Sequence, residues 1–216
     1  KIKIYLNKTW VKFVPAAFGG GILQVNLLVD TILASLLGFG SISFLYFADR
    51  IAQLPLGIIG IALGSVLLTS LSKEYAKKDK KNFSNNLIIS LKIGLFFSIP
   101  TAVAFISFSE LFVSALFERG EFTSLETIQT SHALVAYSVG IPAFIILKSC
   151  QPAFFAEGNT KTPLYIGIIL LVLNIFLSIL FMYYWEHAGI ALATSVASWI
   201  GVIIYIFLLI KTDKII

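Results

Sequence analysis

The apolar segment of residues 41–72 constrains the fold of this chain more than any other feature. It is longer than the roughly 20 residues that cross a bilayer, so it fits a tilted or bent membrane helix. Asp49 and Arg50 nevertheless lie inside it, and Pro55 follows. A guanidinium keeps its charge, so within hydrocarbon it must face water, a partner or an anion. This pattern indicates an anion-binding wall on a deformable helix of a membrane protein.

The rest of the chain has the composition of a protein with several membrane spans. It is 58% hydrophobic and 12% charged, whereas soluble domains have about 45–50% apolar and about 25% charged residues. No linker divides the apolar segments, so we expect residues 1–216 to form a single all-α lobe. The predicted spans cover about residues 13–37, 41–72, 87–117, 127–156, 164–185 and 189–210.

Basic residues gather in the turns on one side of these six spans. They are Lys1, Lys3, Lys8 and Lys12, the lysines between Lys73 and Lys81, and Lys161, Lys211 and Lys214. The opposite turns contain only Arg119 among glutamates. Cytoplasmic loops of membrane proteins carry the excess of lysine and arginine, so we expect both ends in the cytoplasm. The same asymmetry accounts for the net charge of +5 without a nucleic-acid partner.

Arg50 is the leading candidate for contact with an anionic substrate. Gln53 lies about one turn further on the same face, whereas Asp49 points about 100° away and cannot simply neutralise the arginine. Lys148 is either a second phosphate contact or a lysine that extends toward the interface. An alternative for Arg50 itself is a static ion pair with Asp30, which we expect at a similar depth on the preceding span.

A second group of polar residues lies within the first, fifth and sixth spans. Asn26 and Asp30, and likewise Asn174 and Ser178, are spaced by four residues and share a helix face. With Thr194 they offer one carboxylate and several neutral oxygens, a donor set that suits sodium. The alternative is that these side chains only hydrogen-bond the helices to one another.

Motifs of enzymatic chemistry do not occur in the sequence. It lacks GxxxxGK[ST], HExxH, CxxC and G-x-S-x-G. Two separated histidines and the single Cys150 do not make a conventional zinc site. We therefore expect no enzyme and no certain cofactor beyond a possible sodium ion. Because the chain begins at Lys1 without Met, we also expect a segment of a longer protein.

Three ordered segments resemble the MurJ/MviN lipid II flippases of the polysaccharide-exporter superfamily. They are YFADRIAQLPLGIIGIALGSVLLTSLS (46–72), LFERGEFT (116–123) and AYSVGIPAFIILKSCQPAFFAEGNTKTP (136–163). The resemblance covers essentially the whole chain and implies a MATE-like fold, in which two six-helix lobes face a central cavity. This chain resembles the second lobe alone, so the first lobe would be its partner.

The resemblance also implies roles for individual residues. Arg50, in A-D-R, falls on the essential arginine of that lobe and would hold the lipid-linked diphosphate. Ser43 would line the same cavity, and Lys148 falls on a basic position of its motif.

The resemblance further implies a sodium site between the first, fifth and sixth helices of the lobe. Asp30, Asn174 and Thr194 match that site as some family members have it. Ser178 departs from it, because those members have a carboxylate at that position.

These observations predict a lobe of a lipid II flippase in the bacterial cytoplasmic membrane, surrounded by membrane lipids. It would move the undecaprenyl-diphosphate-linked peptidoglycan precursor from the inner to the outer leaflet. The alternatives are an exporter of another lipid-linked oligosaccharide, a multidrug antiporter, or a non-transporting scaffold for cell-wall synthesis.

Overall fold

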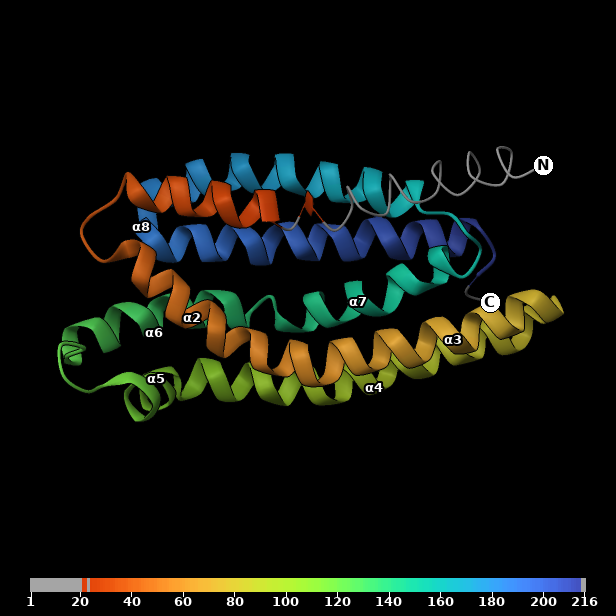
Figure 1. The fold of residues 1–216 in the computed structure, drawn as a ribbon, viewed down its shortest axis with the longest axis horizontal. Coiled ribbons are helices and arrows are strands. Elements are labelled where there is room, and N and C mark those ends of the chain that lie inside the picture. The colour runs from red at the N-terminus through yellow and green to blue at the C-terminus, as the bar shows by residue number, and fades with distance from the viewer. Residues whose placement is uncertain (1–20, 23, 215–216) are drawn as a thin grey trace, which may run out of the picture.

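The computed structural model describes residues 21, 22 and 24–214, and these form an all-α fold (Figure 1). Residues 24–35 are helical and belong to the predicted first span. The beginning of that span and the lysines before it lie outside the described residues.

The predicted second span is a nearly continuous helix with a widened turn in its middle. It consists of α2 (Ser41–Pro55), the π-helix η1 (Leu56–Gly60) and α3 (Ile61–Lys77). Pro55 ends α2 because proline has no N–H to donate and its ring clashes with the carbonyl four residues earlier. The next turn therefore takes the wider π-helical spacing, which is common at functional sites. On both sides of this turn, α2 and α3 are regular α-helices.

The third predicted span is broken where the sequence loses its apolar run. It consists of α4 (Lys80–Ser107) and α5 (Ser109–Phe117), separated at Phe108. Within the predicted fourth span, α6 (Ser124–Ser138) and α7 (Ile141–Phe155) meet at a bend of 43°. Pro142 lies at the start of α7, where its missing N–H costs nothing.

The last two predicted spans form α8 (Lys161–Lys211), a run of 51 helical residues that folds back on itself. The fold-back lies at Trp185 and Glu186, where Glu186 has a φ of 49°. Its two arms run antiparallel in Figure 1 (cyan and blue). Gly189 permits the tight return, because a Cβ there would collide with the carbonyl of Phe181. The fold-back falls at the predicted boundary between the spans 164–185 and 189–210. The additional helices of the structure come from the breaks inside the predicted spans 87–117 and 127–156.

Among the described residues, three helical runs are individually long and apolar enough to cross a membrane: 41–77, 80–107 and 161–211. The α6–α7 pair is a fourth if the bend is counted as one broken span. Because α8 doubles back, its length covers two crossings. The chain is thus a multi-pass membrane protein, and its number of crossings stays a prediction.

Helix α7 lies at the centre of the bundle, where it packs against α3, α4 and α8. Its buried face includes Ile145, Cys150 and Phe154. The α3–α4 turn, the α7–α8 connection and the C-terminal end lie together at one end of the molecule in Figure 1. The described lysine-bearing turns therefore meet at the same end, as the charge pattern predicts.

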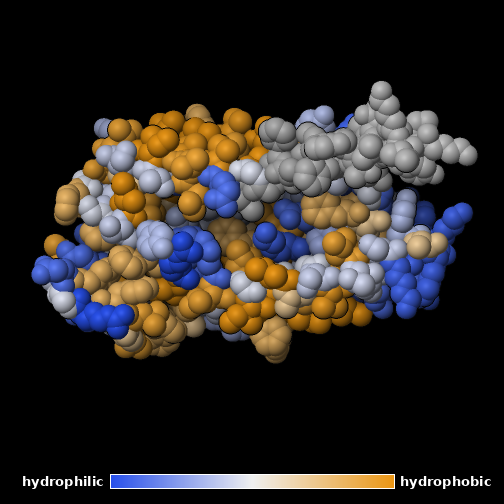
Figure 2. Space-filling view, in the orientation of Figure 1, coloured by the Kyte–Doolittle hydropathy of each residue, from blue (hydrophilic) through white to orange (hydrophobic). Residues whose placement is uncertain are grey.

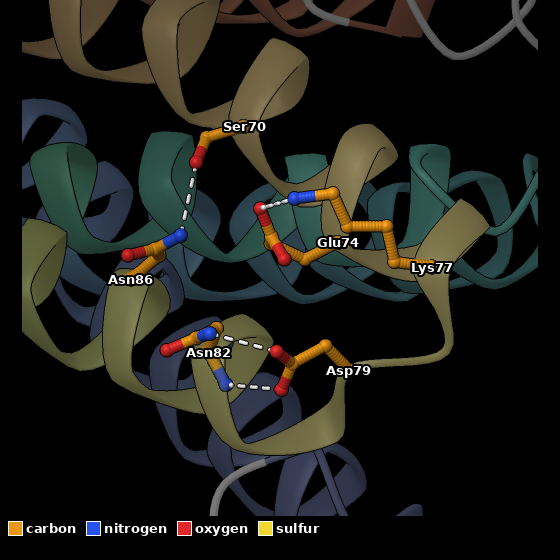
Figure 3. A network of polar contacts seen from close by, with 6 residues as sticks. All are labelled: Ser70, Glu74, Lys77, Asp79, Asn82 and Asn86. Carbon is orange, nitrogen blue, oxygen red and sulfur yellow. Dashed lines mark hydrogen bonds and ion pairs between the residues drawn. The ribbon is translucent and has the colours of Figure 1, made fainter.

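Polar contacts brace the α3–α4 turn at that end (Figure 3). Asp79 caps α4 and accepts hydrogen bonds from the backbone N–H of Asn82 at 3.0 Å and from its side chain at 2.7 Å. Asn86 donates to Ser70 on α3 at 3.0 Å. The turn is held as a rigid helical hairpin.

We expect a bulky side chain at Gly140 to destabilise the α6–α7 bend. A Cβ there would lie 2.9 Å from Ser195 Cα on α8, closer than packed atoms tolerate. Gly140→Val should lower the free energy of unfolding by about 1–3 kcal/mol, measured by thermal unfolding of the full-length parent protein in detergent. Gly57→Ala, where nothing lies within 4 Å, is the matched control and should be neutral or stabilising. Equal losses in both variants would contradict this packing.

The Asp79 cap should also make the stability of the hairpin depend on pH. The hydrogen bonds from Asn82 lower the pKa of the Asp79 carboxyl below its ordinary value. A lowered pKa stabilises the folded state above the ordinary value, and this contribution is lost as the pH falls through the lowered pKa. The difference in melting temperature between wild type and Asp79→Ala should therefore stay constant well above the ordinary pKa of 3.8 and shrink as the pH falls below it. Asp79→Asn, which caps without ionising, should retain most of the stability, and a pH-independent difference would refute this role.

Candidate functional site

One face of α2 carries the polar residues that the sequence singles out. Ser43, Tyr46, Arg50 and Gln53 are spaced by three or four residues and are all exposed. They line one helix face because such spacings return to the same side of an α-helix. Figure 2 shows hydrophilic side chains gathered in a hollow across the middle of the molecule, between apolar surfaces.

Arg50 lies over an aromatic ring and is not paired with a carboxylate. Its Cζ lies 4.6 Å from the centroid of Tyr46, one turn earlier on α2. The Asp49 carboxylate instead accepts a hydrogen bond from Gln53. The ion pairs among the described residues are Glu74–Lys77 and Glu157–Lys214. The alternative of an Asp30–Arg50 pair is therefore wrong for this structure, because Asp30 makes hydrogen bonds to other groups.

Lys148, on α7, lies against the π-helix η1, which is further along the α2–η1–α3 helix than Arg50. It is half-buried on α7, and its Cγ would lie 3.7 Å from a Cβ at Gly60. Its carbonyl oxygen would lie 3.4 Å from a Cβ at Gly64. Gly60 follows Arg50 by ten residues, which is about 15 Å of helix. The structure thus brings Lys148 to the α2–η1–α3 wall but not into contact with Arg50.

A cavity of about 580 Å³ opens at the end of the molecule opposite the lysine-bearing turns, next to Ser43. Its wall includes Phe44, Phe47 and His187. His187 Nε2 donates to the carbonyl of Gln129 at 2.9 Å, and its ring lies 5.3 Å from that of Phe44. Phe47 also contacts Phe117 and Phe122 beside the α5–α6 loop. Sequence reasoning missed this aromatic cluster, and also Tyr46, although its position one turn before Arg50 was a usable signal.

Four of the five predicted polar residues assemble between the helix of residues 24–35 and the two arms of α8: Asn26, Asp30, Asn174 and Thr194. Asp30 Oδ2 accepts from Asn26 Nδ2 at 3.1 Å and lies 3.5 Å from the Thr194 hydroxyl. Asn174 lies 3.0 Å from the same hydroxyl and is only 2% exposed. Residues 164 positions apart are thereby joined in one hydrogen-bonded cluster.

The amide of Asn174 completes this cluster. Its nitrogen donates to Asp30 Oδ1 at 3.1 Å and to Asn26 Oδ1 at 2.9 Å, and its oxygen accepts from Thr194. The cluster is therefore satisfied by hydrogen bonds between its own side chains, and a cation would have to replace some of them.

Ser178 adds an unsatisfied oxygen one turn beyond Asn174. It is completely buried, and its Oγ has no hydrogen-bond partner. A buried hydroxyl without a partner costs free energy, and a ligand can remove that cost. The carboxylate, amide and hydroxyl oxygens of Asp30, Asn174 and Thr194 are ligands that a hard cation takes. Ser178 shares a helix face with Asn174 because it follows that residue by four positions. Among the described residues, no group of three or more His, Cys, Asp or Glu side chains is placed to hold a metal ion.

Comparison with known proteins identifies the family of this chain. The sequence pattern of the family described as "Lipid II flippase MurJ" matches residues 3–216. The chain belongs to the MurJ family. A probable lipid II flippase MurJ of Vibrio cholerae is 36% identical over 188 residues, which are 87% of this chain and 36% of that protein. One from Rickettsia prowazekii is 38% identical over 197 residues, 90% of this chain and 38% of that protein. The chain thus spans well under half the length of these MurJ relatives.

Solved structures agree with the family at the level of the fold. A lipid II flippase MurJ in an inward closed conformation superposes with a TM-score of 0.84 at 34% identity, over 99% of this chain and 46% of that one. An outward-facing multidrug resistance MATE transporter superposes with a TM-score of 0.83 at 17% identity, over 96% of this chain and 46% of that one. The second likeness shows the fold alone. The predicted MATE-like all-α fold is confirmed.

Proposed function

We propose that this chain is one lobe of a lipid II flippase and works with a second six-helix lobe across a shared cavity. The observation that carries the proposal is Arg50, a permanent cation exposed on the polar face of α2 without a carboxylate partner. The polar face lies in a lobe of the MurJ family, whose relatives are named lipid II flippases. The cargo is the undecaprenyl-diphosphate-linked peptidoglycan precursor, which moves from the inner to the outer leaflet.

The guanidinium of Arg50 suits the diphosphate because its planar fork donates two parallel hydrogen bonds to phosphate oxygens. The Tyr46 ring below it supports the cation without neutralising it. Gln53 is held by Asp49 at the edge of the same face, and Ser43 lies toward the outer cavity. Lys148 provides a second basic position further along the wall. The phosphate can therefore exchange one cation for another as it travels.

The α2–η1–α3 wall also contains an irregular turn that would allow the lobe to change conformation. The π-helix after Pro55 lies between Arg50 and the glycines that pack on Lys148. A π-helical turn can return to α-helical spacing with a small change of register, which would rotate Arg50 relative to Lys148. Transporters of this architecture alternate access by rocking lobes around a fixed site. An inside-negative potential favours outward movement of the anionic headgroup by about 2.3 kcal/mol per charge per 100 mV.

We infer that the Asp30 cluster holds sodium when that ion binds this lobe. Asp30, Asn174, Ser178 and Thr194 would supply the ligands, and the ion would add the energy of its gradient to the transport cycle. Turning the Asn174 oxygen toward Asp30 would break its hydrogen bonds to Asp30 and Asn26. The bound ion would also give the buried Ser178 hydroxyl a partner. Sodium would thereby tie the helix of residues 24–35 to both arms of α8.

The proposed location is the bacterial cytoplasmic membrane, with the lysine-bearing turns in the cytoplasm. The charge asymmetry supports this orientation, since all the described lysine-rich turns lie at one end of the fold. In this orientation, the cavity of about 580 Å³ beside Ser43 opens toward the outer leaflet.

Replacing Arg50 should abolish transport while leaving the lobe folded. In a bacterium depleted of its own lipid II flippase, the full-length parent gene should restore growth and outer-leaflet lipid II. Arg50→Ala should fail, because losing charge-assisted hydrogen bonds weakens diphosphate binding roughly ten- to a hundredfold. Arg50→Lys should rescue in part if charge alone matters, and not at all if the bidentate geometry is required.

Arg119→Ala is the matched control for this experiment, because it removes an exposed arginine from the α5–α6 loop outside the polar face. It should rescue like wild type at equal membrane abundance. If Arg50→Ala also rescues fully, the arginine is structural and the proposed contact is wrong. If the wild-type gene never rescues, the transported substrate is a different one.

Sodium should stabilise the purified full-length protein through the Asp30 cluster. Sodium chloride should raise the melting temperature above that in equimolar potassium chloride, because only a bound ion stabilises the folded state specifically. Asp30→Asn should remove this difference. Ser198→Ala is the control, since its hydroxyl bonds only to the carbonyl of Thr194 in the same helix. A sodium effect that persists in Asp30→Asn would place the ion elsewhere.

A further inference from the structure

A stripe along the exposed side of α4 changes from basic to apolar along the helix. Lys81, Asn85 and Lys92 form its basic part, and Phe96, Ile99 and Val103 continue it. Their spacings of four, seven, four, three and four residues keep all six within one narrow face of an α-helix. The opposite side of α4 is buried in the bundle, so this stripe faces away from the protein core.

Lys92 is the unusual member of this stripe. It follows Leu87, the first buried leucine of α4, by five residues and therefore lies about 7–8 Å deeper along the helix. It is exposed and belongs to neither of the ion pairs among the described residues. Side chains on a helix lean toward its N-terminus, so Lys92 leans back toward Asn85 and Lys81. An ammonium at this depth requires an anion or water at the interface.

The hairpin brace fixes the position of these groups. The Asp79 cap and the Asn86–Ser70 hydrogen bond hold the first turns of α4 against α3 (Figure 3). Lys81 and Asn85 lie on these same turns and are exposed. Lys81 and Asn85 are therefore presented on a braced helix end. Lys92 follows on the same face, next to an apolar strip in which Phe96 is 72% exposed.

We propose that this stripe is a binding site for an anionic phospholipid of the leaflet at the lysine-bearing end. The lipid phosphate lies between Asn85 and Lys92, and one acyl chain follows Phe96, Ile99 and Val103. Lys81, about 16 Å from Lys92 along the helix, faces the outer part of the headgroup and adds to the attraction of an anionic lipid. Two unpaired lysines select a lipid with a net negative charge over a zwitterionic one, whose own cation would oppose them. The ordered sequence of polar headgroup, phosphate and acyl chain matches the change from basic to apolar along the stripe.

Native mass spectrometry of the full-length parent protein tests this site, with phosphatidylglycerol and phosphatidylethanolamine offered at equal concentrations. Wild type should retain phosphatidylglycerol preferentially. Each of Lys81→Gln and Lys92→Gln should weaken that retention roughly fivefold, the effect of one lysine near an anionic lipid. Lys92→Arg should keep most of the binding because it keeps the charge.

Lys211→Gln removes an exposed lysine at the same end of the molecule but away from α4, and it should leave retention unchanged. An equal loss in Lys211→Gln would show that lysines attract the lipid by charge alone, and it would overturn the site. Retention at the wild-type level in the Lys81→Gln/Lys92→Gln double variant would also overturn it. Equal retention of both phospholipids would also overturn it. Retention of undecaprenyl diphosphate in place of phosphatidylglycerol would assign the stripe to the transported lipid instead. Unchanged melting temperatures would show that the variants remain folded.

Discussion

A charge inside a bilayer must be solvated by something, and this requirement organises the polar residues of the lobe. Asp30 is satisfied by amide and hydroxyl groups from its own helix and from α8. Arg50 has only the Tyr46 ring and is otherwise open to the exposed face of α2. The two charges therefore have different roles: Asp30 belongs to a closed polar cluster, whereas Arg50 remains available to an anion. Their separation leaves the arginine without a carboxylate partner among the ion pairs of the described residues.

The irregular backbone of the lobe occurs where helices meet these polar groups. The π-helix follows Pro55 and places Gly60 near Lys148, while the α6–α7 bend places Gly140 directly against Ser195. The fold-back of α8 returns Thr194 beside Asn174. Backbone irregularity within a membrane is tolerated where protein or a water-filled cavity surrounds it. The fold-back of α8 in particular brings distant polar residues together.

The sequence predicted which residues belong to each site better than it predicted which residues contact one another there. Spacings of three and four residues placed Gln53 near Arg50 and Asn26 near Asp30, because helix geometry alone decides such neighbours. It could not decide whether Asp30 meets Arg50 or Thr194, since that depends on how α2 and α8 pack around the first helix. The aromatic cluster of Phe47, Phe117 and Phe122 was likewise invisible, because it joins α2 to the start and end of the α5–α6 loop.

By itself, the sequence determined that this chain is helical, membrane-embedded and basic at one end. Those properties follow from long apolar segments, from backbone hydrogen bonds that must be made internally in lipid, and from lysines confined to certain turns. Only the tertiary structure decided where the helices break and which side chains meet across them. Neighbours within a helix depend on local geometry, whereas contacts such as Thr194 with Asp30 depend on the packing of segments 164 residues apart.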